Sequence, residues 1–208
     1  MAMQEIRKRS LDLAASRVET SDDANAPNGR IVGYAAVFDT WTVLSRSKTA
    51  EGREIIRPGA FDVALAESDD VVMLIEHDHR LIVARTRAGT LRLSVDDYGL
   101  RFEADLPDTT RARDLRADIL AGNYDGASFG YLPRPGGETI TKRTENGVLI
   151  VESEITSAYL TDVSVVGSPA YQGTAVETRS SDPSRSRKRL ILLDSRARLD
   201  AIKHRISH

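Results

Sequence analysis

Gly126-Ala127-Ser128-Phe129-Gly130-Tyr131 places a serine between small residues and aromatic side chains. Such a mixture of small and aromatic residues is typical of a tightly packed strand. The stretch lacks the G-x-S-x-G spacing of the nucleophile elbow in α/β-hydrolases. Ser128 is therefore either an ordinary small residue in a strand or a nucleophile. The choice between the two depends on the partners that the rest of the chain supplies.

The composition narrows the class of protein. The chain has 208 residues, of which 29% are charged and 5% aromatic, and its formal net charge is -2. This charge balance gives no general attraction to nucleic acid or to a membrane surface. The chain contains no cysteine, which excludes thiol catalysis, disulfides and cysteine-ligated zinc. No apolar run approaches the roughly 20 residues that a membrane span needs. We expect a globular protein that requires neither nucleic acid nor a membrane.

Hydrophobic periodicity predicts a β-rich α+β fold. Helices are expected at residues 60–67 and 108–123, where apolar residues recur at helical spacing. Residues 39–52 are polar and are expected to form a loop. Strands are predicted by alternating or β-branched runs at 6–13, 31–38, 71–75, 81–85, 91–95, 100–106, 139–143, 148–155 and 160–166. This pattern is typical of a β-barrel or sandwich with one or two packed helices.

The composition changes after Gly173. Residues 174–187 are polar and rich in serine and arginine, which is typical of a linker. Residues 190–206 carry leucine and isoleucine at roughly helical intervals among basic residues. Such a basic amphipathic tail is either an ordinary solvated helix or a docking segment for an acidic partner, a nucleic acid or a membrane surface.

A serine nucleophile needs a base, and histidine is the usual one because its ordinary pKa lies near neutrality. The chain has four histidines, and two of them lie in the tail. The base is therefore His77 or His79. These two would point the same way on a strand, and with Asp78 or Asp162 they would also suit a divalent metal ion. Spacing alone favours a polar surface for the two histidines, then a catalytic base, and last a metal site.

Several segments between Gly29 and Tyr171 form a characteristic series. They are Gly33-Tyr34-Ala35-Ala36-Val37-Phe38, Ile55-Ile56-Arg57-Pro58-Gly59-Ala60-Phe61-Asp62, His77-Asp78, Leu91-Arg92-Leu93, Asp97-Tyr98-Gly99-Leu100, Leu106-Pro107-Asp108-Thr109, Ala112-Arg113-Asp114-Leu115, the Ser128 stretch, and Asp162-Val163-Ser164-Val165-Val166-Gly167-Ser168-Pro169-Ala170-Tyr171. In the number, order and spacing of these segments, the chain resembles the prohead (procapsid maturation) serine proteases of tailed bacteriophages.

The resemblance implies the fold of the herpesvirus assembly proteases, a closed or nearly closed antiparallel β-barrel with packed helices. It implies that Ser128 is the nucleophile, in the family's S-F-G motif. It implies that His77, the histidine followed by aspartate, is the base. Asp162 falls on the acidic position of the [D/E]-V-S motif, where many relatives carry glutamate, and would orient His77. The loop Gly167-Ser168 is a candidate for the donors that stabilise the oxyanion.

The resemblance also implies a biological role. Residues 1–173 would form the prohead serine protease domain, and residues 174–208 its linker and tail. The enzyme would cut the major capsid protein and scaffold segments, and possibly itself, inside the assembling prohead in the host cytoplasm. It would need no cofactor or metal ion, and a homodimer or larger assembly is plausible. The alternative is a catalytically inactive capsid-assembly or scaffolding protein that binds the major capsid protein.

Overall fold

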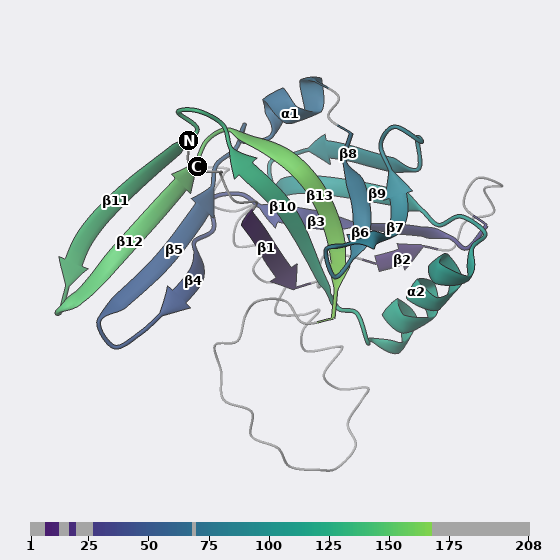
Figure 1. Cartoon of the computed structure of the whole chain (residues 1–208), viewed down its shortest axis with the longest axis horizontal. Coiled ribbons are helices and arrows are strands. Elements are labelled where there is room, and N and C mark those ends of the chain that lie inside the picture. The colour runs from purple at the N-terminus through teal and green to yellow at the C-terminus, as the bar shows by residue number, and fades with distance from the viewer. Residues whose placement is uncertain (1–6, 13–16, 20–26, 68–69, 168–208) are drawn as a thin grey trace, which may run out of the picture. The chain divides into compact units, whose positions relative to one another are not determined.

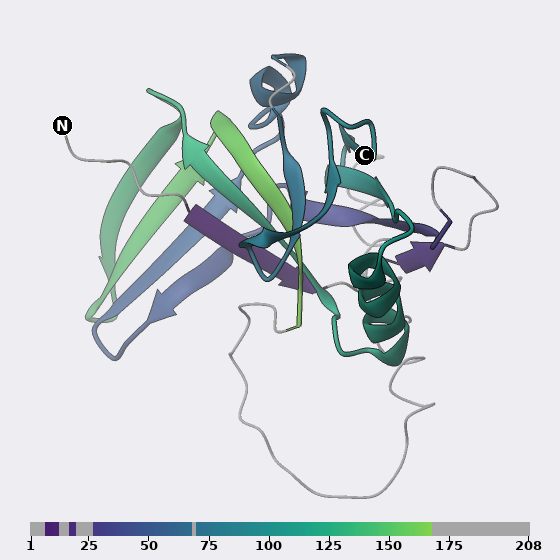
Figure 2. The same ribbon diagram turned by 45° about the vertical axis from the view of Figure 1, so that its right-hand side comes forward.

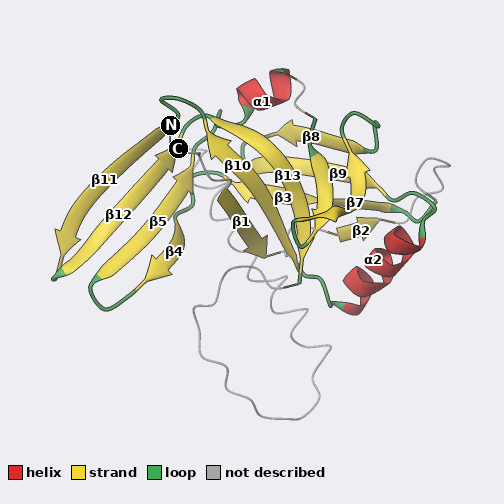
Figure 3. Cartoon of the chain, viewed as in Figure 1, coloured by secondary structure: helices red, strands yellow, loops and turns green. Residues whose placement is uncertain are grey.

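The computed structural model describes residues 7–12, 17–19, 27–67 and 70–167, which form three β-sheets and two helices (Figures 1 and 3). The helices are α1 (Asp62–Ala66) and α2 (Thr110–Ala121). The strands are β1 (Arg7–Asp12), β2 (Arg17–Glu19), β3 (Arg30–Val37), β4 (Thr42–Arg46), β5 (Ala50–Ile56), β6 (Val72–Ile75), β7 (Asp78–Arg85), β8 (Leu91–Val95), β9 (Gly99–Asp105), β10 (Gly126–Pro133), β11 (Glu138–Glu145), β12 (Val148–Ile155) and β13 (Ala158–Val166). The β-rich α+β class predicted from the sequence is confirmed.

The sheets are open within the described residues. The central sheet has the strand order β1-β10-β13-β6-β7, the second β2-β3-β9-β8, and the third β11-β12-β5-β4 (Figure 2). The expected closed barrel is not confirmed, because β4, β5, β11 and β12 pair with one another in a sheet of their own. The expectation of purely antiparallel strands is wrong for two pairs, since β13 runs parallel to β6 and β12 runs parallel to β5.

Aromatic side chains from the central sheet anchor the core. Phe129 and Tyr131, two residues apart on β10, are 2% and 0% exposed, and their ring centroids lie 5.3 Å apart. Phe61, which precedes α1, meets Phe129 edge to face at 5.6 Å. Burying one such side chain contributes about 2–3 kcal/mol. Successive side chains of a strand point to opposite faces, so this packing turns the side chain of Ser128 to the other face of β10.

One bent ribbon joins the central and third sheets. β10 continues into β11, and β12 continues into β13. Both connections bend between the pair Pro133–Ala158 and the pair Glu138–Ile155. Gly137 fits at the bend because a Cβ there would lie 2.1 Å from the carbonyl oxygen of Ser157. The third sheet is therefore an extension of the two strands on which Ser128 and Asp162 lie.

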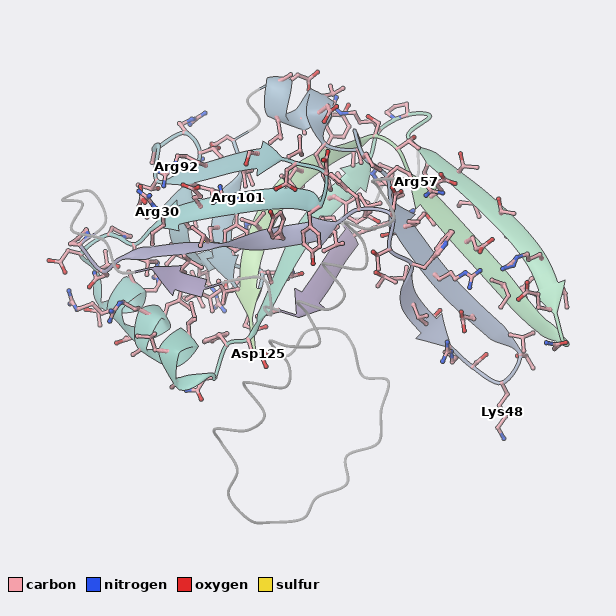
Figure 4. All side chains as sticks on the ribbon, turned by 180° about the vertical axis from the view of Figure 1, so that it is seen from behind. Arg30, Lys48, Arg57, Arg92, Arg101 and Asp125 are labelled. Atoms are coloured by element: carbon pink, nitrogen blue, oxygen red, sulfur yellow. The ribbon has the colours of Figure 1, made fainter. Side chains whose placement is uncertain are left out.

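The prediction of a loop at residues 39–52 is wrong, because β4 and the start of β5 lie there. The segment is polar because its strands belong to a largely exposed sheet that is joined by ion pairs, such as Arg46 of β4 with Glu51 of β5 at 2.7 Å. Arg53 pairs with Glu152 on β12 and lies over the ring of Trp41, with 5.0 Å between its guanidinium carbon and the ring centroid. Figure 4 shows Lys48 at the tip of the β4–β5 hairpin and Arg57 at its base.

Helix α2 lies within the predicted range 108–123 and has a capping residue at each end. The Thr109 side chain accepts a hydrogen bond from the Ala112 N–H at 3.2 Å, and Gly122 ends the helix with a φ of 82°. Neither of the two described helices is long and apolar enough to cross a membrane. The linker and amphipathic tail expected at 174–208 lie outside the described residues, so the boundary at residue 173 stays a prediction.

Candidate active site

Strand β10 fixes the position of Ser128. In the central sheet Ser128 lies opposite Ser164 of β13 on one side and opposite Ser10 of β1 on the other. Its side chain is fully buried, with a residue exposure of 0%. A serine held in the middle of a paired strand has a fixed backbone, so the direction of its hydroxyl is set by the groups on that face of the sheet.

A two-residue turn carries His77. Ile75 at the end of β6 pairs with Asp78 at the start of β7, which leaves Glu76 and His77 to form the turn. Both have a φ of 54°, the left-handed region that a type I′ turn requires. A non-glycine residue held there costs about 1–3 kcal/mol, and such residues cluster at functional sites.

Glu76 ties this turn to the end of β13. Its backbone N–H donates to the carbonyl oxygen of Val165 at 2.9 Å, and its Oε1 accepts a hydrogen bond from the N–H of Gly167 at 2.6 Å. The turn is therefore held against the strand that carries Asp162, and the ring of His77 is held over the sheet. The Gly167 N–H already has this acceptor, which argues against it as an oxyanion donor; Ser168 lies outside the described residues.

Ser128, His77 and Asp162 form a continuous line of contacts. Nε2 of His77 lies 2.5 Å from Oγ of Ser128, and Nδ1 of His77 lies 2.5 Å from Oδ1 of Asp162. The side chains of His77 and Asp162 are 8% and 1% exposed. The carboxylate accepts a hydrogen bond from Nδ1–H, which leaves the lone pair of Nε2 for the serine hydroxyl.

Two hydroxyl groups hold the Asp162 carboxylate in place. Ser164 donates to Oδ1 at 2.9 Å, and its Oγ also lies 3.2 Å from Nδ1 of His77. Thr161 donates to Oδ2 at 3.1 Å. Burial acts to raise the pKa of Asp162, but the hydrogen bonds from His77, Ser164 and Thr161 and the attraction of His77 outweigh it. The pKa of Asp162 is therefore lowered, and the group is a carboxylate at neutral pH.

The structure brings together the three residues that the resemblance singled out and separates His79 from them. His79 is an exposed residue of β7, whereas His77 lies in the turn, so the two do not share a strand face as expected. Within the described ranges, no group of three or more His, Cys, Asp or Glu residues is placed to hold a metal ion. Both ring nitrogens of His77 contact Ser128 and Asp162, which leaves the metal interpretation without support.

Sequence reasoning missed Ser164 and Thr161 as partners of the carboxylate. The signal for Ser164 was present, because residues two apart on a strand share a face and Ser164 follows Asp162 at that interval. Thr161 had no such signal. It is adjacent to Asp162 in the chain, and only the local backbone brings its hydroxyl to Oδ2.

Similarity to known proteins identifies the family of this chain. No curated protein sequence matches the chain at a significant level. The solved structure of the bacteriophage T4 capsid assembly protease, gp21, is similar with a TM-score of 0.49 and 14% identity, covering 80% of this chain and 99% of that chain. The model of the caudovirus prohead serine proteases matches residues 16–188, which include the turn, β10 and β13. The chain therefore belongs to the caudovirus prohead serine protease family.

Proposed function

We propose that Ser128 is the nucleophile, His77 the general base and Asp162 the orienting acid of a serine endopeptidase. The observation that carries the proposal is the line of contacts from Oγ of Ser128 through the imidazole of His77 to the Asp162 carboxylate, with both distances at 2.5 Å. Membership of a serine protease family supports the same roles.

The geometry suits acyl transfer. Oγ of Ser128 attacks the carbonyl carbon of the peptide bond while Nε2 of His77 takes the hydroxyl proton. His77 then gives this proton to the leaving amine as the C–N bond breaks, and the acyl group stays on Ser128 as an ester. Water, deprotonated by His77, attacks the ester carbonyl, and His77 returns the proton to Oγ of Ser128 as the C–O bond breaks and the carboxylic acid leaves. Asp162 stabilises the imidazolium in both steps, and proton transfer of this kind contributes about 10²- to 10⁴-fold to the rate.

The substrates that fit this family are the major capsid protein and scaffold segments, cut inside the assembling prohead in the host cytoplasm. Cleavage of the chain itself, in the 174–208 tail, belongs to the same proposal. The activity needs neither cofactor nor metal ion. A homodimer or larger assembly is part of the same proposal.

One observation favours the alternative of an inactive assembly or scaffolding protein that only binds the major capsid protein. Ser128 is 0% exposed, so no peptide carbonyl reaches its Oγ in this arrangement. The two functions differ in what happens to the bound capsid protein. The protease shortens it, whereas the scaffold leaves it intact.

Co-expression with the major capsid protein of the same phage tests the proposal, with intact mass as the readout. We expect cleavage with the wild type and with the matched control His79→Ala, and none with Ser128→Ala or His77→Ala. Cleavage by Ser128→Ala would overturn the assignment of the nucleophile. Stable binding without cleavage by the wild type would establish the scaffolding function instead.

A further inference from the structure

Strand β1 occupies the edge of the strand that carries Ser128. β1 pairs antiparallel with β10, with Arg7 opposite Tyr131 and Ser10 opposite Ser128. β13 pairs with the other edge of β10, so β1 is the outermost strand of this sheet, as Figures 1 and 2 show. An extended peptide can add to a sheet by main-chain pairing at such an edge. A peptide that pairs with β10 beside Ser128 must therefore take the place of β1.

The side chain of Arg7 lies among carboxylates at one end of this pairing. Its two terminal nitrogens donate to both oxygens of Glu138, at 2.5 and 3.0 Å, which is the bidentate geometry specific to arginine. Glu54, which is 2% exposed, lies 3.7 Å from the same guanidinium. Ser153 donates to Glu138 at 2.6 Å and fixes its carboxylate.

A buried carboxylate favours a cation beside it, because an uncompensated buried charge is strongly destabilising. Glu54 and Glu138 belong to β5 and β11, so the third sheet holds them in place whether or not β1 is paired. If β1 leaves the edge of β10, these two carboxylates select the peptide that replaces it. They favour one with a basic side chain at the same register.

We propose that Glu54 and Glu138 form a substrate subsite for an arginine or lysine side chain. The subsite takes the residue three positions before the one that lies opposite Ser128, as Arg7 lies three before Ser10. Three residues of strand span about 10 Å, which separates this subsite from the reacting serine. The inference rests on the proposed function and adds a specificity to it.

The sequence contains a second segment that fits the subsite. Arg7-Lys8-Arg9-Ser10-Leu11 has a counterpart in Arg187-Lys188-Arg189-Leu190-Ile191, and Arg-Lys-Arg occurs in the chain at these two places. With Arg187 in the subsite, Leu190 would lie opposite Ser128. The stretch 168–186 leads from the end of β13 to Arg187 and reaches at most about 65 Å. β13 ends beside Gly126, so Arg187 must reach roughly 17 Å along β10 to lie opposite Tyr131, and the connecting stretch is long enough. The tail segment 187–191 is therefore the occupant that we infer.

The test measures cleavage of fluorogenic peptides by the full-length chain. One peptide has the sequence of residues 184–194, and the other carries Arg187→Glu. We expect the wild type to cut the first with a kcat/KM about 10- to 100-fold higher, as for a charge-assisted pair. Glu138→Arg should reverse this preference. The matched control Glu145→Arg, at the far end of β11 beside Arg143, should leave the preference unchanged.

The effect of Arg7→Glu shows whether Glu138 forms a substrate subsite or only a structural ion pair with Arg7. A structural pair predicts that Arg7→Glu and Glu138→Arg lower activity together, since each breaks the same contact. The subsite predicts opposite effects on cleavage of the Arg187 peptide. Arg7→Glu removes the competing strand and lowers KM, whereas Glu138→Arg raises KM. Melting temperatures of both variants show that the chain is folded.

The two proposals fail differently. If the wild type leaves the major capsid protein intact, the proposed function fails and the subsite with it. If it cleaves the capsid protein in a Ser128-dependent way, but kcat/KM does not depend on the charge at position 187, the subsite alone fails. The same holds if Arg7→Glu does not cut the Arg187 peptide, or if Arg7→Glu and Glu138→Arg change activity in the same direction.

Discussion

A Cβ atom on Gly130 would lie 2.1 Å from Oδ2 of Asp162, far inside the contact distance of two heavy atoms. The same atom would lie 2.5 Å from Oγ1 of Thr161, which donates to that oxygen. Gly130 pairs with Asp162 in the register of β10 and β13, two residues after Ser128. The glycine of the S-F-G stretch therefore leaves room for the carboxylate that contacts His77.

Gly130→Ala is expected to displace the Asp162 carboxylate and to reduce kcat by about 100-fold, since a shift of about 1 Å in a catalytic group has an effect of this size. Overpacking should also lower the free energy of unfolding by about 1–3 kcal/mol. Peptide cleavage and urea unfolding measure the two effects. Gly89→Ala is the matched control. It has open space around its Cβ and a φ of 70°, so it should lose stability alone. Full activity in Gly130→Ala would contradict the steric argument.

The lowered pKa of Asp162 predicts how stability depends on pH. Burial raises the pKa of this carboxyl, but hydrogen bonds from His77 and other partners bring it below the ordinary 3.8. A group whose pKa is lower in the folded state contributes stability above its unfolded pKa, and the contribution is lost as pH falls through the folded pKa. The difference in unfolding free energy between wild type and Asp162→Asn should therefore shrink as pH falls below 3.8. Urea unfolding across the acid range measures it, and a difference that grows toward low pH would mean that the pKa is raised.

Ser164 should act as a positioning residue for His77. Its Oγ donates to Asp162 at 2.9 Å and lies 3.2 Å from Nδ1 of the imidazole. Ser164→Ala removes about 1–1.5 kcal/mol of hydrogen bonding, so kcat should fall about 10-fold with KM unchanged. Steady-state kinetics separate the two constants. Ser94→Ala, at an exposed position of β8, is the matched control and should change neither constant. A rise in KM at constant kcat would assign Ser164 to substrate binding instead.

Two hairpin turns in which both central residues have a positive φ show which part of the site the sequence could predict. Asn146 and Gly147, with φ of 50° and 79°, join β11 to β12, and Asn-Gly is the strongest sequence signal for such a turn. Glu76 and His77 take the same conformation at 54° without any such preference. Their turn is held by Val165 and Gly167, which are distant in the sequence. His77 was therefore predicted at the end of a strand, and only the tertiary contacts show that it lies in a turn.

The central strands and the β11–β12 hairpin were predictable, whereas β4, the start of β5 and their assembly into the third sheet were not. β6 is a continuous apolar run and β13 is apolar apart from Thr161, Asp162 and Ser164, because most of their residues are buried, and burial leaves a clear pattern in the sequence. β4 lies in an exposed part of the third sheet, so most of its residues are polar or exposed and show little periodicity. The pairing of β5 with β12, which joins residues about 100 positions apart, has no local signal. The periodicity allowed a barrel or a sandwich, and the resemblance implied a closed antiparallel barrel, but neither indicated that these strands form a separate sheet.

The β6–β7 turn places a catalytic side chain, whereas the β11–β12 turn does not. Inserting one glycine between Glu76 and His77 lengthens a turn that positions the imidazole between Ser128 and Asp162. Because contacts of 2.5 Å tolerate little displacement, kcat should fall by about 100-fold or more. The same insertion between Asn146 and Gly147 is the matched control. It lengthens a turn of the same kind at an exposed hairpin tip, where insertions are tolerated, and should leave kcat within about twofold. Peptide cleavage with thermal unfolding distinguishes the outcomes. Equal activity in the two insertion variants would show that the β6–β7 turn does not set the position of His77.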